Sequence, residues 1–207
     1  MFNEIFFPGA VVLDAGCGKE SAVPLNNGLE TRVGVDISHL FLMSNKNVNL
    51  KIVADLESLP FKNATFDVIL SQYVMEHLKN PEKVISEFRR VTKDRPTILI
   101  LTTNALNYIA LATHLMPFSI QRFIKKRFLR IPEDEIYPVY YRCNTIFKLN
   151  RMMRRIGFEN EKSVFVGGPF YFAFSLPLFR VAMLFERITD GMLRFLKFYV
   201  VVRYGKK

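Results

Sequence analysis

The chain contains no tryptophan and only two cysteines, Cys17 and Cys143, among its 207 residues. Two cysteines so far apart, with no Cys/His spacing around them, provide neither a disulfide framework nor a metal site. The first residues, Met1 to Pro8, lack the basic segment with which a secretory signal peptide begins. We therefore expect a cytoplasmic protein without a bound metal.

Acidic residues are scarce in the second half of the chain. Residues 1–100 hold 11 Lys/Arg and 12 Asp/Glu, whereas residues 101–207 hold 18 Lys/Arg and only 7 Asp/Glu. The net charge of +10 therefore comes from the second half. Such an asymmetry favours an anionic partner for that half, such as a membrane surface, a nucleic acid or a phosphorylated substrate.

The chain also lacks an uninterrupted apolar run long enough to cross a membrane, for which about 20 residues are needed. Residues 163–179 carry no charge, but this stretch is short and is interrupted by Gly167, Gly168, Pro169 and Pro177. Its first part, Val164 to Val166, is expected to finish the sheet. The remainder is expected to be an interfacial segment and not a membrane span.

What is present in the first hundred residues is an alternation of apolar strands and a helix. Short apolar runs predict five buried strands, at residues 10–13, 32–35, 48–53, 66–70 and 97–101. Asn80 and Pro81 start a helix between the last two. This order predicts an α/β fold, a Rossmann-like, doubly wound and mostly parallel sheet.

Acidic residues and glycines follow the predicted strands, at the edge of the sheet where such folds bind ligands. Gly16 and Gly18 let the backbone approach a ligand closely, and Asp36 can accept hydrogen bonds from a ribose diol. The third glycine of the dinucleotide fingerprint is replaced by Ser21. Asp14, next to this turn, would repel a pyrophosphate but would favour a ligand with a sulfonium and an ammonium group. These features indicate S-adenosylmethionine as the cofactor.

The same segments resemble class I S-adenosylmethionine-dependent methyltransferases, in particular the subgroup of ubiquinone and menaquinone methyltransferases. The resemblance covers roughly residues 10–104 and rests on the segments Val12-Leu-Asp-Ala-Gly-Cys-Gly18, Val33-Gly-Val-Asp-Ile-Ser38, Ala54-Asp-Leu-Glu-Ser-Leu-Pro-Phe61, Phe66-Asp-Val-Ile-Leu-Ser-Gln-Tyr-Val-Met-Glu-His-Leu78, Glu87-Phe-Arg-Arg-Val-Thr-Lys93 and Leu101-Thr-Thr-Asn104. A late Gly157-Phe158 also matches.

The resemblance implies which residues bind the cofactor: Asp14, Gly16, Cys17, Gly18, Asp36, Ile37, Asp55, Leu56 and Ser71. Relatives carry helices before the first strand that close over the cofactor, but only about nine residues precede it here. Either the second half, a homodimer or another protein partner supplies the lid, or the site is unusually open.

The second half is expected to choose the methyl acceptor. Residues 121–130 interleave basic and large apolar side chains, as in an amphipathic helix on an anionic membrane. Arg180, Arg187 and Arg194 recur every seven residues and are expected to share one helix face. We expect a methyltransferase domain at 1–166, with a helical insertion at about 105–140, and an amphipathic, membrane-associated extension at 167–207.

These patterns predict a methyltransferase that acts on a small or lipid-linked acceptor, such as a lipid-linked saccharide or quinone precursor, at the inner face of the membrane. Two alternatives stay open: a nucleic-acid methyltransferase that uses the basic half, and a non-catalytic cofactor-binding subunit that anchors a partner. If the acceptor is a hydroxyl, a base helps the reaction. The candidates, which the sequence does not rank, are His77, His114, Tyr108 and Tyr140.

Overall fold

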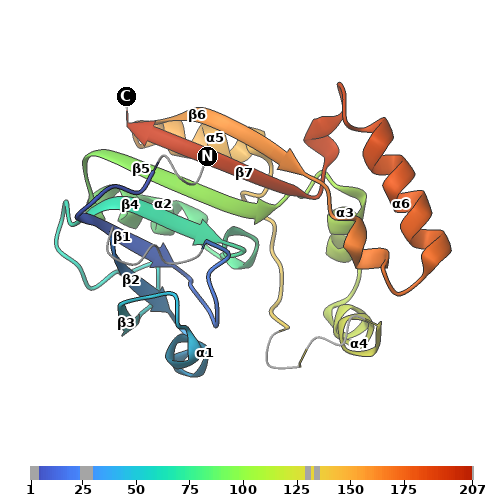
Figure 1. The fold of residues 1–207 in the computed structure, drawn as a ribbon, viewed down its shortest axis with the longest axis horizontal. Helices are drawn as coiled ribbons and strands as arrows, with labels where there is room; N and C mark the ends of the chain where they lie inside the picture. Colours follow the sequence, from blue (N-terminus) through green and yellow to red (C-terminus); the bar gives the residue numbers. More distant parts are fainter. Residues whose placement is uncertain (1–4, 24–29, 129–131, 133–135, 207) are drawn as a thin grey trace.

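A computed structural model describes residues 5–23, 30–128, 132 and 136–206. They form a seven-stranded sheet in the order β3-β2-β1-β4-β5-β7-β6 (Figure 1). The strands are β1 (Ala10–Ala15), β2 (Glu30–Asp36), β3 (Leu50–Val53), β4 (Phe66–Gln72), β5 (Thr92–Thr103), β6 (Phe158–Val166) and β7 (Tyr199–Lys206). The five strands predicted in the first hundred residues and the α/β class are confirmed.

Helices α2 (Pro81–Val91) and α5 (Ile146–Arg155) cover one face of the sheet (Figure 1). Both are amphipathic, and their apolar stripes join the strands in the main core. Pro81 occupies the first turn of α2, and Gly157 follows α5 with a φ of 87°, which only glycine adopts easily. The predicted start of α2 is therefore confirmed. Two short helices, α1 (His39–Ser44) and the 3-10 helix η1 (Met75–His77), follow β2 and β4.

The position of the last strand, β7, does not agree with the expected domain boundary at residue 166. β7 lies between β5 and β6 and runs antiparallel to both. Its buried residues Val200, Val202 and Tyr204 belong to the main core. The end of the expected C-terminal extension is thus part of the sheet. It pairs with β5 on one side and β6 on the other, and its alternating apolar residues pack into the core.

The remaining helices gather beyond the carboxyl ends of β4 and β5 (Figure 1). They are α3 (Tyr108–Leu115), α4 (Phe118–Phe128), η3 (Pro169–Phe172), α6 (Leu176–Ile188) and η4 (Arg194–Leu196). Residues 129–131 and 133–135 of the expected insertion lie outside the described residues. In the described part of the chain, every helix is too short or too polar to cross a bilayer.

One prediction about this region is wrong. Arg180 and Arg187 lie on α6, but that helix ends at Ile188, and Arg194 begins the separate 3-10 helix η4. The three arginines therefore do not share one continuous helix face. Asn104 and Asn107, just after β5, hold η4 in place, since their side-chain amides donate to the carbonyls of Phe195, Leu196 and Lys197.

The placement of β7 predicts that charge in this strand unfolds the protein. Val202 is fully buried, whereas Val166 on β6 is 44% exposed. We expect Val202→Asp to lower the free energy of unfolding by more than about 3 kcal/mol, because it buries a charge without a partner. Val166→Asp is the matched control and should change it by less than about 1 kcal/mol. Urea denaturation of both variants checks this, and a tolerated Val202→Asp would contradict the assignment of β7.

Candidate active site

The register of the sheet brings the predicted cofactor residues to one edge. Ala15 pairs with Val35 of β2 on one side and with Ser71 of β4 on the other. Asp36, one residue further along β2, pairs with the last residue of β3. Because these strands are parallel, the segments that follow them emerge side by side.

A tight turn after β1 forms the floor of this edge. The N–H groups of Gly16 and Cys17 both donate to the carbonyl of Val35, at 2.7 and 3.1 Å. Gly16 has a φ of 73°, and a Cβ built on it would lie 2.4 Å from Cγ2 of Val74. A glycine is therefore required by both the backbone conformation and the close approach.

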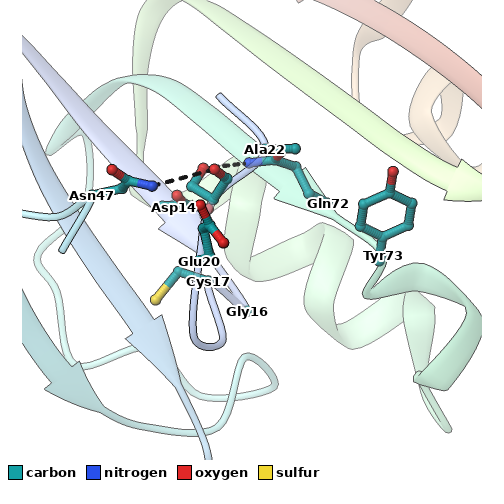
Figure 2. A pocket seen from close by; sticks show the side chains of 9 residues that line it. Asp14, Gly16, Cys17, Glu20, Ala22, Asn47, Gln72 and Tyr73 are labelled. Atoms are coloured by element: carbon teal, nitrogen blue, oxygen red, sulfur yellow. Dashed lines mark hydrogen bonds between the residues drawn. The ribbon is translucent and has the colours of Figure 1, made fainter. Parts of the chain in front are cut away.

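A cavity of about 470 Å³ opens beside this turn (Figure 2). It is lined by Asp14, Gly16, Cys17, Glu20, Ser21, Ala22, Asn47, Gln72 and Tyr73. Gln72 donates to the hydroxyl of Ser21 at 2.8 Å, and Asn47 donates to the carbonyl of Ser21 at 3.4 Å (Figure 2). These bonds hold residue 21 in place, and the volume lies within the range of small-molecule and cofactor sites.

Asp14 is the most unusual group in the cavity. Its carboxylate is buried, and neither oxygen has a hydrogen-bond partner among the described residues. Burial raises the pKa of Asp14 to about 6, although the polar side chains of Ser21 and Gln72, which lie near the carboxylate without a well-formed hydrogen bond to it, and the charge of Arg32 lower it. A buried carboxylate without a partner is costly, so its environment is suited to a ligand that brings a cation.

The other predicted cofactor residues do not line this cavity. Both oxygens of Asp36 accept backbone bonds of 2.8 Å, from the N–H groups of Gly18 and Ser38. Each oxygen keeps a second lone pair, which leaves two acceptors for a ribose diol. Ser71 is fully buried, and no described group bonds to its hydroxyl.

The residues predicted to contact the adenine lie at the ends of β2 and β3. Ile37 is 72% exposed, whereas Leu56 is buried. An oxygen of Asp55 accepts from the N–H of Glu57 at 2.8 Å. The exposed Ile37 offers an apolar surface on which a flat aromatic ring could pack.

Cys17 contributes to the packing of the site, and its thiol is not reactive. Its side chain is buried with Leu42 and Val48, and burial raises the pKa of the thiol to about 12. The thiol is therefore protonated and unreactive at neutral pH.

None of the four candidate bases lines the cavity. Tyr108 packs against Phe172 and Phe185 in the helical region, and the ring of His114 lies 5.8 Å from that of Tyr141. The backbone N–H of Tyr140 donates to the carbonyl of Glu76 at 2.7 Å.

His77 is the candidate base for which a hydrogen bond indicates the tautomer. Its Nδ1 lies 2.7 Å from the carbonyl of Pro138. A carbonyl can only accept, so this nitrogen carries the proton, and Nε2 of the neutral ring is left as an acceptor.

Tyr73 is a residue of the site that the sequence did not indicate. It directly follows β4, has a φ of 57° and lies at the mouth of the cavity (Figure 2). A left-handed conformation is uncommon for a bulky residue and is often found at functional sites. Burial raises the pKa of Tyr73, with a further contribution from Glu76, so its hydroxyl stays neutral and can donate or accept a hydrogen bond.

The charges around the cavity fit a cationic cofactor. Asp14 and Glu20 line it, and Asp36 lies close enough to raise the pKa of Asp14 further. This concentration of carboxylates would repel a phosphate and attract a sulfonium and an ammonium group. The unpartnered Asp14 and the acidic lining of the cavity together fit S-adenosylmethionine.

Comparison with known proteins supports the same class. Residues 13–100 match the family model described as a methyltransferase domain. A segment of 104 residues is 36% identical to the tRNA (carboxymethyluridine(34)-5-O)-methyltransferase of Arabidopsis thaliana, covering 48% of this chain and 25% of that protein. A segment of 121 residues is 28% identical to the ubiquinone/menaquinone biosynthesis C-methyltransferase UbiE of Blochmanniella pennsylvanica, covering 52% and 48%.

The fold extends this similarity over the whole chain. The S-adenosylmethionine-dependent methyltransferase of Mesorhizobium loti superposes with a TM-score of 0.58 at 14% identity, covering 96% of this chain and 92% of that one. The class predicted from the motifs is confirmed: residues 13–100 carry a class I methyltransferase domain, an enzyme domain whose methyl donor is S-adenosylmethionine. The chain spans about half or less of the curated relatives that it matches.

The turn after β1 predicts a steric coupling between Gly16 and Val74. Gly16→Ala should cost about 2–4 kcal/mol of unfolding free energy, because strain at positive φ adds to the overlap with Val74. Gly9→Ala is the control: its φ is 83°, but no described atom lies within 4 Å of its Cβ position, so only the strain of about 1 kcal/mol remains. Gly16→Ala with Val74→Ala should cost less than the sum of the two single changes. Additive effects in thermal unfolding would show that the overlap is absent.

The environment of Asp14 predicts that this carboxylate lowers the free energy of unfolding of the unliganded protein at neutral pH. The folded-state pKa of about 6 lies above the ordinary value of 3.8, so folding is penalised above pH 6 and the penalty disappears as the pH falls towards 4. Asp14→Asn should raise the unfolding free energy by about 1–3 kcal/mol at pH 7.5, and by little at pH 4. Urea denaturation at both pH values measures this, with the exposed Glu82→Gln as the control. A destabilised variant at pH 7.5 would indicate that Asp14 already has a partner.

Proposed function

We propose that the protein transfers the methyl group of S-adenosylmethionine to a lipid or lipid-linked acceptor at the membrane surface. The main support for S-adenosylmethionine as the cofactor is the buried, unpartnered carboxylate of Asp14 in an acidic cavity. Asp14 would bind the ammonium group of the methionine moiety, and Asp36 the ribose diol. Ile37, Asp55 and Leu56 would border the adenine, and Ser71 would lie near the methionine end.

S-adenosylmethionine supplies a methyl group on a positively charged sulfur, and the transfer is an in-line displacement. The residues of the chain act by positioning the reactants and by excluding water. Tyr73, at the mouth of the cavity, can orient the acceptor through its neutral hydroxyl. If the acceptor is a hydroxyl group, a base outside the cavity lining would take its proton, and His77 is our candidate through its Nε2.

The acceptor part of the proposal is supported by a second, apolar cavity of about 160 Å³ between α3 and α6. It is lined by Tyr108, Phe172, Leu178, Val181, Ala182 and Phe185. A hydrocarbon chain is the ligand that such a lining favours. The helices that form this cavity lie at the same end of the sheet as the cofactor cavity (Figure 1).

One alternative acceptor is supported by a separate observation. Lys and Arg outnumber Asp and Glu in the second half of the chain, and one relative is named as a tRNA methyltransferase. A nucleic-acid acceptor would account for the basic charge, but it would leave the apolar cavity without a function. A subunit that binds the cofactor and catalyses nothing is the remaining alternative.

The test is a transfer assay with methyl-labelled S-adenosylmethionine, using lipid extract and total RNA from the expression host as separate acceptors. We expect label in the lipid fraction. Asp36→Ala should weaken cofactor binding, measured by calorimetry, more than about a hundredfold, since two hydrogen bonds to a charged group are lost. Thermal unfolding checks that this variant still folds.

The other outcomes of this assay contradict the proposal in different ways. Label in the RNA fraction alone would favour the nucleic-acid enzyme. Cofactor binding without transfer to either fraction would favour the non-catalytic subunit. Wild-type protein that binds no cofactor would overturn the assignment of the cavity.

A further inference from the structure

Helix α6 presents an apolar face to solvent. Val181, Leu184 and Ile188 follow one another at helical spacing and are 65%, 59% and 64% exposed. The opposite face holds the buried Ala182 and Glu186. An ordinary surface helix shows the reverse pattern, with its apolar stripe turned to the core.

The orientation of α6 is set by polar contacts on its inner side. The carboxylate of Glu186 accepts from the N–H of Gly168 at 3.2 Å and pairs with Lys197 at 3.4 Å. Rotation of the helix to bury its apolar face would break both contacts and expose Phe179 and Phe185. The exposed apolar face is therefore a consequence of the native packing.

Exposed apolar side chains continue around α6 and onto the neighbouring helices. Met192, just beyond α6, is 94% exposed, and Leu115 at the end of α3 is 75% exposed. Tyr108 of α3 contacts Phe185 of α6, and Phe128 of α4 contacts Phe174 just before α6. The three helices thus form one unit (Figure 1). More than half of the exposed large apolar side chains of the described residues lie in residues 106–128 and 174–193.

The exposed charged side chains of α3, α4 and α6 are all basic. Arg180 and Arg187 are exposed, lie two turns apart and flank the apolar face of α6. Residues 95–132 and 162–185 contain no Asp or Glu. Long basic side chains beside an apolar face can bury their stems while their charges reach the phosphates of a lipid headgroup layer.

We propose that the outer face of α6, which we define as Arg180, Val181, Leu184, Arg187 and Ile188, docks on an anionic lipid bilayer. The helix lies in the interface and does not cross it. A second copy of the chain is a poorer occupant, because a symmetric contact through α6 would bring like charges together. A nucleic acid would neutralise the arginines but leave the apolar side chains in water.

This docking would place the cofactor cavity beside the bilayer, because α6 lies at the same end of the sheet. The membrane contact itself does not depend on the proposed function. Only the idea that this contact presents a lipid acceptor to the enzyme rests on the proposed function.

The test is co-sedimentation of the protein with vesicles of phosphatidylcholine, with and without phosphatidylglycerol. We expect binding to the anionic vesicles that is released by salt. Arg180→Glu with Arg187→Glu should weaken binding roughly thirtyfold or more, from about 1 kcal/mol per basic residue at the surface. Leu184→Asp with Ile188→Asp should abolish binding. Because these side chains are exposed, we expect this variant to fold.

The matched controls lie on α5, on a face of the sheet away from this surface. Arg151→Glu with Arg154→Glu makes the same change of charge, and Phe147→Asp removes a side chain that is 68% exposed. Both controls should bind like the wild type. Equal loss in the α5 variants, or equal binding to uncharged vesicles, would overturn the proposal.

Two further measurements separate this proposal from its competitors. A wild-type dimer that the α6 variants dissociate, without vesicle binding, would show that a second copy covers the face. Cofactor affinity, measured by calorimetry, should be unchanged in the α6 variants. Vesicle binding without any cofactor binding would therefore support the docking surface while contradicting the proposed function.

Discussion

The turn after β1 is the constraint on which the site depends. Its two backbone N–H groups converge on one carbonyl of β2, and the N–H of Gly18 bonds to the carboxylate of Asp36. These bonds fix the ends of β1 and β2 relative to each other. They also leave Asp14 buried at the base of the cavity without a described partner. A larger residue at position 16 would meet Val74 and move this whole arrangement.

The cofactor cavity and the helices beside it carry opposite charges. The cofactor cavity is acidic, whereas the helices beside it are basic and expose apolar side chains. An acidic cavity attracts a cationic cofactor, and a basic surface attracts an anionic layer. Glu186 and Lys197 keep α6 docked with its apolar face outward. Under the proposed function, the acidic cavity would hold the cofactor and the basic helices would meet the lipid acceptor.

Local patterns predicted much of the fold. The five strands of the first hundred residues were predicted from apolar runs, and the start of α2 from Asn80 and Pro81. β7 was not, because Tyr199–Lys206 pairs with strands far away in the chain, and its apolar residues equally suit an amphipathic tail. The extent of α6 was also missed, since the sequence repeats arginine every seven residues beyond the point where the helix ends.

The sequence by itself determined the class of protein and the chemistry of the cofactor edge, because glycines and carboxylates at strand ends carry that information locally. Only the tertiary structure decided that Asp14 lacks a partner, that Tyr73 reaches the cavity and that the four candidate bases do not line it. It also decided which face of α6 meets solvent. Burial and pairing depend on groups brought together from distant parts of the chain, and no local pattern specifies them.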